Sequence, residues 1–182
     1  MSKIKLIATG INVVPLVTAL QRNPHYWNEH TMRTENETSP HYELDDIWVR
    51  FNDIKNYNDN HADFISEHDS VWYQCADVLP VKDLVYPLMA AVKGERLGGI
   101  LITRIKPGQI CKPHEDTGWH AKYYHKYAIQ LQGNIKQAFH FEDESLITLP
   151  GDVYWFDNSF KHWVTNDSDQ DRITMIVCIK HD

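Results

Sequence analysis

The chain has 182 residues, enough for one domain with a hydrophobic core, and 42% of them are apolar and 12% aromatic, which excludes a disordered chain. The net charge of −7, with basic residues scattered singly, argues against nucleic acid as the main partner. Three cysteines without a CxxC pair, no long apolar run and no signal-like N-terminus predict a cytoplasmic protein without disulfides or membrane spans.

The first half of the chain alternates between helical and polar segments. Asn12 can cap a helix and Pro15 is tolerated in a first helical turn, so a helix is predicted from there to about residue 22. A second helix is predicted over 81–95 in spite of Pro87. Polar loops are predicted on both sides of one strand with alternating faces: the loops are 23–45 and 55–69, and the strand is 46–53.

From residue 96 onward, short segments with alternating faces follow one another, separated by Gly, Pro, Asn and Asp turns. The predicted strands are 100–105, 127–133, 136–142, 145–149, 152–157, 162–166 and 172–180. This succession predicts an antiparallel sandwich or barrel. We therefore expect an α+β, mainly β, single domain over 1–182, with a helical or mixed part (1–95) packed on a β core (96–182).

Potential metal ligands gather in one loop between two predicted strands, 113–126, which holds three histidines and two acidic residues. Residues two apart at a strand end point to the same side, so His114 and Asp116 can bind one ion. Fe(II) oxygenases commonly use two histidines and one carboxylate in this way. The motif alone is weak, because His61-Ala62-Asp63 repeats it, but that pair lies in a polar loop with no predicted strands around it.

A third ligand and an anion-binding residue follow in the last two predicted strands. His162 begins one of them, and Arg172 begins the most apolar strand of the chain. An arginine in that position is explained if it holds a carboxylate in a bidentate pair. Together with His114 and Asp116, these residues predict a metal centre beside an anion site. Two further histidines of the opening loop remain alternative ligands: His120 and His125.

Over about residues 99–182 the chain resembles the Fe(II)/2-oxoglutarate-dependent dioxygenases, and within them the aspartyl/asparaginyl β-hydroxylase branch, which includes small bacterial proline hydroxylases. The resemblance is carried by TRIKPGQICKPH, by the His-Glu-Asp at 114–116, and by LPGDVYWFDNSFKHWVTNDSDQDRITMIVCIKH, in which DNSFKH precedes the second histidine and Arg172 follows it by ten residues. The fold that this resemblance implies is a double-stranded β-helix, a jelly roll of the cupin kind.

The resemblance implies a role for six residues. Three of them would hold iron: His114, Asp116 and His162. Three would bind 2-oxoglutarate: Arg172 at its distal carboxylate, with Thr103 and Lys126 assisting. Lys126 stands where the family has an arginine, and Ala128 stands where it often has a histidine. The chain keeps the Asp ligand that the animal β-hydroxylases lack, so it is more similar to the bacterial proline hydroxylases.

The activity implied is hydroxylation of a C–H bond of an amino acid or amino-acid residue, with succinate and CO2 as coproducts, so the partner would be a small-molecule or peptide substrate. Candidate substrate-binding residues lie in the opening loop and in the strand at 46–53; they are Trp119, His120, Tyr124, His125, Trp48, Arg50 and Asn52. Arg50 would bind a substrate carboxylate.

Two other readings remain open. The spacings Gly108-x5-His114 and His162-x3-Asn166 are similar to cupin motifs, which favours a metal-dependent isomerase or an oxygenase that needs no cosubstrate. A cupin, however, usually has a histidine where Asp116 stands, and has no special need for Arg172. The second reading is a β-barrel binding module without catalysis.

Overall fold

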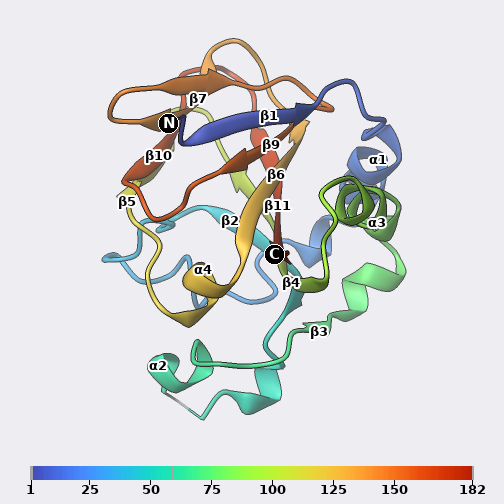
Figure 1. The fold of residues 1–182 in the computed structure, drawn as a ribbon, viewed down its shortest axis with the longest axis vertical. Coiled ribbons are helices and arrows are strands. Elements are labelled where there is room, and N and C mark those ends of the chain that lie inside the picture. Colours follow the sequence, from blue (N-terminus) through green and yellow to red (C-terminus); the bar gives the residue numbers. More distant parts are fainter. Residues whose placement is uncertain (1, 59, 182) are drawn as a thin grey trace.

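The computed structural model describes residues 2–58 and 60–181, which form two antiparallel sheets flanked by short helices (Figure 1). The strands of the larger sheet are β1 (Ile4–Ala8), β2 (Asp45–Phe51), β3 (Val71–Trp72), β4 (Arg96–Ile105), β6 (His125–Gln132), β9 (Val153–Phe156) and β11 (Arg172–Lys180). The strands of the smaller sheet are β5 (Ile110–His114), β7 (Gln137–Phe141), β8 (Ser145–Ile147) and β10 (His162–Asn166). Their orders are β1-β9-β6-β11-β4-β2-β3 and β5-β10-β7-β8.

Within the described residues, four α-helices accompany the sheets: α1 (Val14–Arg22), α2 (His61–Phe64), α3 (Lys82–Ala91) and α4 (Trp119–Tyr123). The same part of the chain contains 3₁₀ turns at Pro24–Tyr26, Ile54–Asn56 and Gln74–Asp77. Among the described residues, no helix is both long enough and apolar enough to cross a membrane. The helices α1 and α3 lie together on one side of the larger sheet (Figure 1).

The two long helices begin and end close to where the sequence places them. The side chain of Asn12 accepts a hydrogen bond from the backbone N–H of Val14 at 3.2 Å, so it supports the start of α1 although Val13 occupies the cap position. The helix α3 ends at Ala91 rather than at residue 95, because Lys93 takes a positive φ of 56° and Gly94 N–H bonds back to Met89 O at 2.7 Å.

Each face of the larger sheet covers a separate apolar core. The helix-side core joins α1 and α3 to one face, through Leu16, Leu20, Val85, Leu88, Val49, Ile102, Ile129 and Met175. The inner core lies between the sheets and contains Ile105, Cys111, Ala128, Phe139, Tyr154, Phe156 and Val164. Alternation along β11, β4 and β6 produces both cores, because successive side chains point to opposite faces.

The expected fold class is confirmed: the chain is mainly β, with two facing antiparallel sheets and a few helices packed on them. The part before residue 96 contributes more strand than its sequence predicts, since β1, β2 and β3 all join the larger sheet. β1 pairs with β9, from the other end of the chain. The predicted polar loop at 55–69 contains α2, and the opening loop contains α4, which the sequence analysis did not predict.

Candidate metal centre

Pairing of two strands in the smaller sheet brings two histidines together. His114 ends β5 and His162 begins β10, and the antiparallel register places the two opposite each other. Their ring centroids are 4.4 Å apart. Asp116 follows β5 by two residues, and its backbone N–H bonds to Asn158 O at 3.0 Å, which fixes its position beside the rings.

The three side chains offer their ligand atoms to a common point. His114 Nε2 lies 3.7 Å from one Asp116 carboxylate oxygen, and His162 Nε2 lies 3.9 Å from the other. Carbonyl oxygens can only accept, so His114 Nδ1 donates to Lys112 O at 2.7 Å and His162 Nδ1 donates to Phe160 O at 2.8 Å. Both Nε2 atoms therefore keep a free lone pair directed at the carboxylate, as two metal ligands require.

The protonation states of the three groups also suit a cation. Burial lowers the pKa of His162 to about 4 and lowers that of His114 from its ordinary value, so both rings are neutral at pH 7. Burial raises the pKa of Asp116, but the charge of Lys126 and its hydrogen bond more than offset burial, and the net pKa is lowered. The carboxylate is therefore ionised, and the set has the donors of a two-histidine, one-carboxylate iron site.

Arg172 lies at the start of β11 and is only 3% exposed. Its guanidinium donates to Thr174 Oγ1 at 2.6 Å, Tyr154 Oη at 3.3 Å and Thr148 Oγ1 at 3.5 Å. All three partners are neutral hydroxyls, and no described carboxylate lies within ion-pair distance of Arg172. A buried guanidinium without a counter-charge is costly, so this environment favours an anionic ligand.

The two other residues implied in cosubstrate binding have partners of their own. The Thr103 hydroxyl donates to Asp46 Oδ1 at 2.7 Å, and Asp46 also faces Arg33 Nη1, 3.2 Å from its Oδ2. Lys126 forms an ion pair with Asp116 Oδ2. Here Lys126 therefore supports a candidate metal ligand, and its contact with a cosubstrate stays a prediction.

A cavity of about 430 Å³ joins the metal ligands to Arg172, because both line its wall. Lys126, Thr103 and Thr174 line it as well, together with apolar side chains such as Phe139, Tyr154, Phe156 and Ile176. Five aromatic rings line the wall beyond the metal ligands, and we call them the aromatic wall: Trp48, Phe51, Phe64, Trp119 and His120. Neighbouring rings of this wall lie in contact, for example Trp48 and Phe51 with centroids 5.2 Å apart.

Some predicted substrate residues lie away from this cavity. The guanidinium of Arg50 donates to the carbonyls of Ser70 and Leu97, and His125 stacks on His181 with centroids 4.1 Å apart. Neither residue lines the cavity, and neither do Asn52 and Tyr124. The register between β2 and β4 shifts between Trp48 and Arg50, which moves Arg50 to the helix-side face and turns Phe51 toward the cavity.

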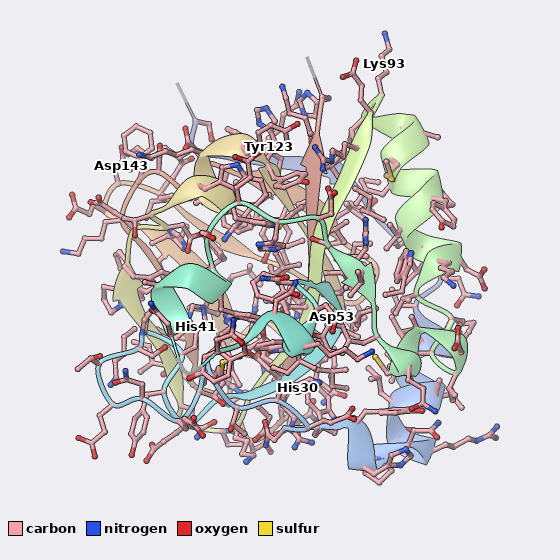
Figure 2. The ribbon with its side chains drawn as sticks, turned by 90° about the horizontal axis from the view of Figure 1, so that it is seen from below. His30, His41, Asp53, Lys93, Tyr123 and Asp143 are labelled. Atoms are coloured by element: carbon pink, nitrogen blue, oxygen red, sulfur yellow. The ribbon has the colours of Figure 1, made fainter. Side chains whose placement is uncertain are left out.

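The sequence leaves residues 33–53 open between a substrate lid, an oligomer contact and a surface loop, and it does not place 32–41 or 64–65 in the cavity wall, where the structure has them. Met32, Arg33, Pro40 and His41 reach the cavity from the segment before β2, along which Figure 2 labels His30 and His41. No periodic pattern marks this segment, so only its density of charged and aromatic residues could have drawn attention to it. Lys93 and Asp143, in contrast, point outward at the periphery in Figure 2.

The other cysteine and histidine predictions have simple outcomes. The three cysteines are buried free thiols, as expected: Cys75, Cys111 and Cys178. His120 lines the cavity, and its Nε2 accepts a hydrogen bond from Gly99 N–H at 3.3 Å, so it is not poised as a ligand. The side chains of His61 and Asp63 lie outside the described part of the structure.

Two solved structures resemble the whole fold. One is a prolyl hydroxylase from Trichoplax adhaerens in complex with a peptide fragment of the hypoxia inducible factor oxygen degradation domain, with a TM-score of 0.63 at 7% identity, covering 99% of this chain and 84% of that one. The other is an oxidoreductase of the 2OG-Fe(II) oxygenase family from Burkholderia pseudomallei, with a TM-score of 0.57 at 11% identity, covering 90% of this chain and 78% of that one. At these identities the likeness shows the fold.

Comparison of the sequence itself with known proteins gives the family. A search of curated proteins found no match. The family model described as aspartyl/asparaginyl beta-hydroxylase matches residues 18–182, which include every candidate ligand and nearly the whole described fold. The expected family is thus confirmed, and the chain belongs to the aspartyl/asparaginyl β-hydroxylase family of enzymes.

Proposed function

We propose that the protein is an Fe(II)- and 2-oxoglutarate-dependent oxygenase that hydroxylates a C–H bond of an amino acid or amino-acid residue. One observation carries this proposal: a two-histidine, one-carboxylate set shares a cavity with a buried arginine whose partners in the described structure are all neutral. The first feature fits Fe(II), and the second fits the distal carboxylate of a 2-oxoacid. Family membership supports both assignments.

The chain's own residues would divide the work as follows. His114 and His162 present neutral Nε2 atoms, and Asp116 supplies one negative charge, with Lys126 holding its carboxylate ionised. Arg172 binds and orients a carboxylate, assisted by the hydroxyls around it. When bound, Fe(II) and 2-oxoglutarate supply oxygen activation, with oxidative decarboxylation to succinate and CO2. Phe139, Phe156 and Ile176 line this part of the cavity, and their apolar side chains would limit the entry of water.

The aromatic wall supports a substrate with an apolar or ring-shaped reacting group, as in proline, over one with a carboxylate or amide. Burial, followed by the charge of Lys126, lowers the pKa of His120 to about 3, so this ring is neutral like the others in the wall. Most of this surface is ring face, against which an aspartate or asparagine side chain would lose hydration at a cost in free energy. The Nε1–H of Trp48 has no hydrogen-bond partner among the described residues and is a wall donor that would offset part of this cost. The ring of proline carries no hydrated polar group beyond the backbone, so its burial against the wall has no such cost.

Succinate release tests the proposal. Purified protein is given Fe(II), 2-oxoglutarate and O2 with free amino acids and with peptides that carry proline, leucine, aspartate or asparagine. We expect succinate in amounts matching the hydroxylated product, highest for an apolar substrate, and loss of both in His162→Ala. The matched control is His140→Ala, a histidine on the neighbouring strand β7 that does not line the cavity.

Two results would contradict the proposal in different ways. Product formed without 2-oxoglutarate would favour the cupin-type alternative. Tight Fe(II) binding without turnover of any substrate or cosubstrate would favour a binding module. If succinate and product form but the aspartyl or asparaginyl substrates are preferred, the oxygenase stands and the argument from the aromatic wall is wrong.

A further inference from the structure

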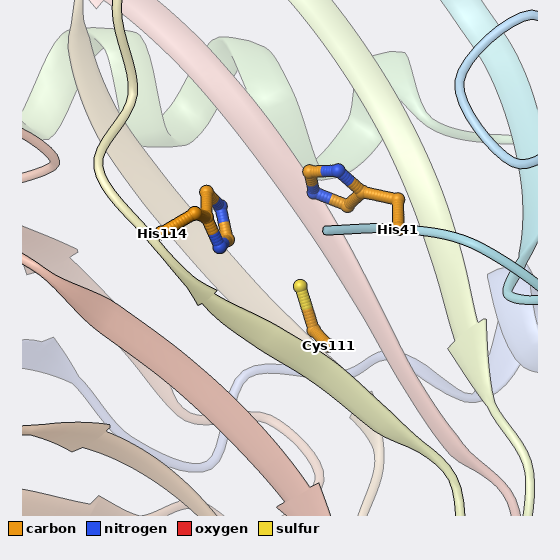
Figure 3. A group of neighbouring side chains, drawn as sticks. All are labelled: His41, Cys111 and His114. Atoms are coloured by element: carbon orange, nitrogen blue, oxygen red, sulfur yellow. The ribbon is translucent and has the colours of Figure 1, made fainter. Parts of the chain in front are cut away.

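A second set of potential metal ligands lies beside the first. His41, Cys111 and His114 each offer one ligand atom, and these atoms all lie within 4.8 Å of one another. Figure 3 shows the two imidazole rings side by side and steeply inclined to each other, in an edge-to-face arrangement, with the thiol of Cys111 pointing toward the gap between them. The rings of His41 and His114 have centroids 5.1 Å apart.

Backbone bonding holds this set in place. Cys111 and His114 belong to the same strand, β5. His41 comes from the segment before β2, and that segment is tied to β5 because Lys112 N–H donates to Pro40 O at 2.8 Å. Leu44 is buried, and its N–H bonds to His41 O at 3.1 Å. Backbone hydrogen bonds therefore fix His41 through the residue before it and through its own carbonyl, which holds its side chain close to β5.

The ligand atoms of His41 and Cys111 are available to bind an ion. Among the described residues, neither the imidazole nitrogens of His41 nor the Sγ atom of Cys111 has a hydrogen-bond partner. Both residues line the cavity, so an ion from solvent can reach them. Two nitrogens and one sulfur are the ligands of a tetrahedral zinc site whose fourth position is left to water.

The ligand types distinguish the two sets. The first set, with its carboxylate, suits Fe(II), whereas thiolate selects thiophilic ions. Ligands around tetrahedral Zn²⁺ are about 3.3–3.8 Å apart at ordinary bond lengths, so closing this set requires movements of about 1 Å or less. The Cys111 thiol would release its proton to solvent as the cation binds.

We propose that His41, Cys111 and His114 form a second cation site, selective for a thiophilic divalent ion such as Zn²⁺, that competes with the first site for His114. His114 Nδ1 is committed to Lys112 O, which leaves Nε2 as its one free nitrogen. One nitrogen serves one ion at a time, so the two sites exclude each other. A thiophilic cation would then displace iron by removing one of its ligands, without needing Asp116 or His162.

Cobalt binding to the metal-free protein tests the site without relying on the proposed reaction. Co²⁺ bound by a thiolate has a near-ultraviolet charge-transfer band that it lacks with nitrogen and oxygen ligands alone. We expect this band in the wild type, in Asp116→Asn and in Cys178→Ser, which removes another cavity-lining thiol. We expect the band to vanish in Cys111→Ser and to require at least tenfold more Co²⁺ in His41→Ala.

The outcomes are decisive in both directions. A band that persists in Cys111→Ser, is absent from the wild type, or is lost equally in Cys178→Ser overturns the proposal. If Cys111→Ser does not fold, by circular dichroism, His41→Ala on the surface segment decides alone. The competition is read from Fe(II) displacement: Zn²⁺ should displace Fe(II) from the wild type at concentrations at least tenfold lower than from His41→Ala. Equal concentrations would show that Zn²⁺ acts at the first site only.

Discussion

Replacing Arg172 by methionine separates a ligand-binding role from a structural one. The guanidinium is 3% exposed and meets only hydroxyls, so the ligand-free protein carries a buried charge without a described counter-charge. A buried arginine in an ion pair would cost about 3–5 kcal/mol on removal, because its partner would be left uncompensated. Arg172→Met leaves no such partner, and we expect destabilisation of about 1–2 kcal/mol or less, mainly from lost packing and hydrogen bonds.

Arg172→Met should also greatly weaken the binding of 2-oxoglutarate. Removing one partner of a buried charge-assisted pair costs about 2–5 kcal/mol, which corresponds to a roughly 30- to 5,000-fold rise in Kd. Urea unfolding of the ligand-free protein measures the first effect, and quenching of tryptophan fluorescence by 2-oxoglutarate, with a redox-inert divalent metal present, measures the second.

Arg104→Met is the matched control for both measurements. Arg104 is paired with Asp45, stacks over Trp27 and does not line the cavity. It should leave 2-oxoglutarate affinity unchanged. The reasoning is refuted if Arg172→Met alters that affinity less than threefold, or if it destabilises the ligand-free protein by about 3 kcal/mol or more, as a structural ion pair would.

Four further outcomes are expected. The unfolded chain protonates His162 below about pH 6.5 but the folded chain only below about pH 4, so His162 should contribute about 2 kcal/mol to the stability lost by pH 5; urea unfolding in chelator checks this against His162→Gln, whose loss between pH 7 and pH 5 should be smaller by that amount, while other buried histidines such as His120 keep the rest of the slope. Lys126→Met removes the charge that lowers the pKa of Asp116, and burial, which raises this pKa, then dominates. As the pH is lowered, Fe(II) titrations should therefore show that binding is lost at a higher pH in Lys126→Met than in Lys126→Arg. Trp119→Ala should raise KM for an apolar substrate about tenfold and leave KM for 2-oxoglutarate unchanged in succinate assays. Gly151→Ala places a Cβ 2.6 Å from Ile11 O at a φ of +91°, and urea unfolding should show a free energy of unfolding lower by about 1–3 kcal/mol. The decrease should be smaller for Gly108→Ala, where φ is +75° and nothing lies within 4 Å of the added Cβ.

The sequence predicts the second half of the fold well because its strands alternate and its turns carry Gly, Pro, Asn and Asp. The strands around 127–133 and 172–180 match β6 and β11 closely for this reason. β1 escapes prediction because Ile4–Ala8 is a short edge strand whose stability comes from pairing with β9, about 150 residues away. No local pattern reports such a partner.

The candidate metal ligands follow from strand spacing and the family resemblance, and the structure brings all three together. The prediction for Arg50 assumed unbroken alternation along β2. A single shift in register after Trp48 sends Arg50 to the other face, and such a shift depends on how β2 meets β4. The segment that carries Arg33 and His41 is held by bonds such as Lys112 N–H to Pro40 O, which sequence periodicity cannot reveal.

The placement of the anion site and the histidine pair on different layers has a mechanical consequence. Both histidines belong to the smaller sheet, and Arg172 belongs to the larger one. A diacid bound at one end by a metal on the histidine pair and at the other end by Arg172 would connect the two sheets, so its length would have to match the distance between them. A diacid one carbon shorter or longer would bind at both ends only if the distance between the sheets changed. The spacing of the two sheets would therefore determine which chain length the site accepts.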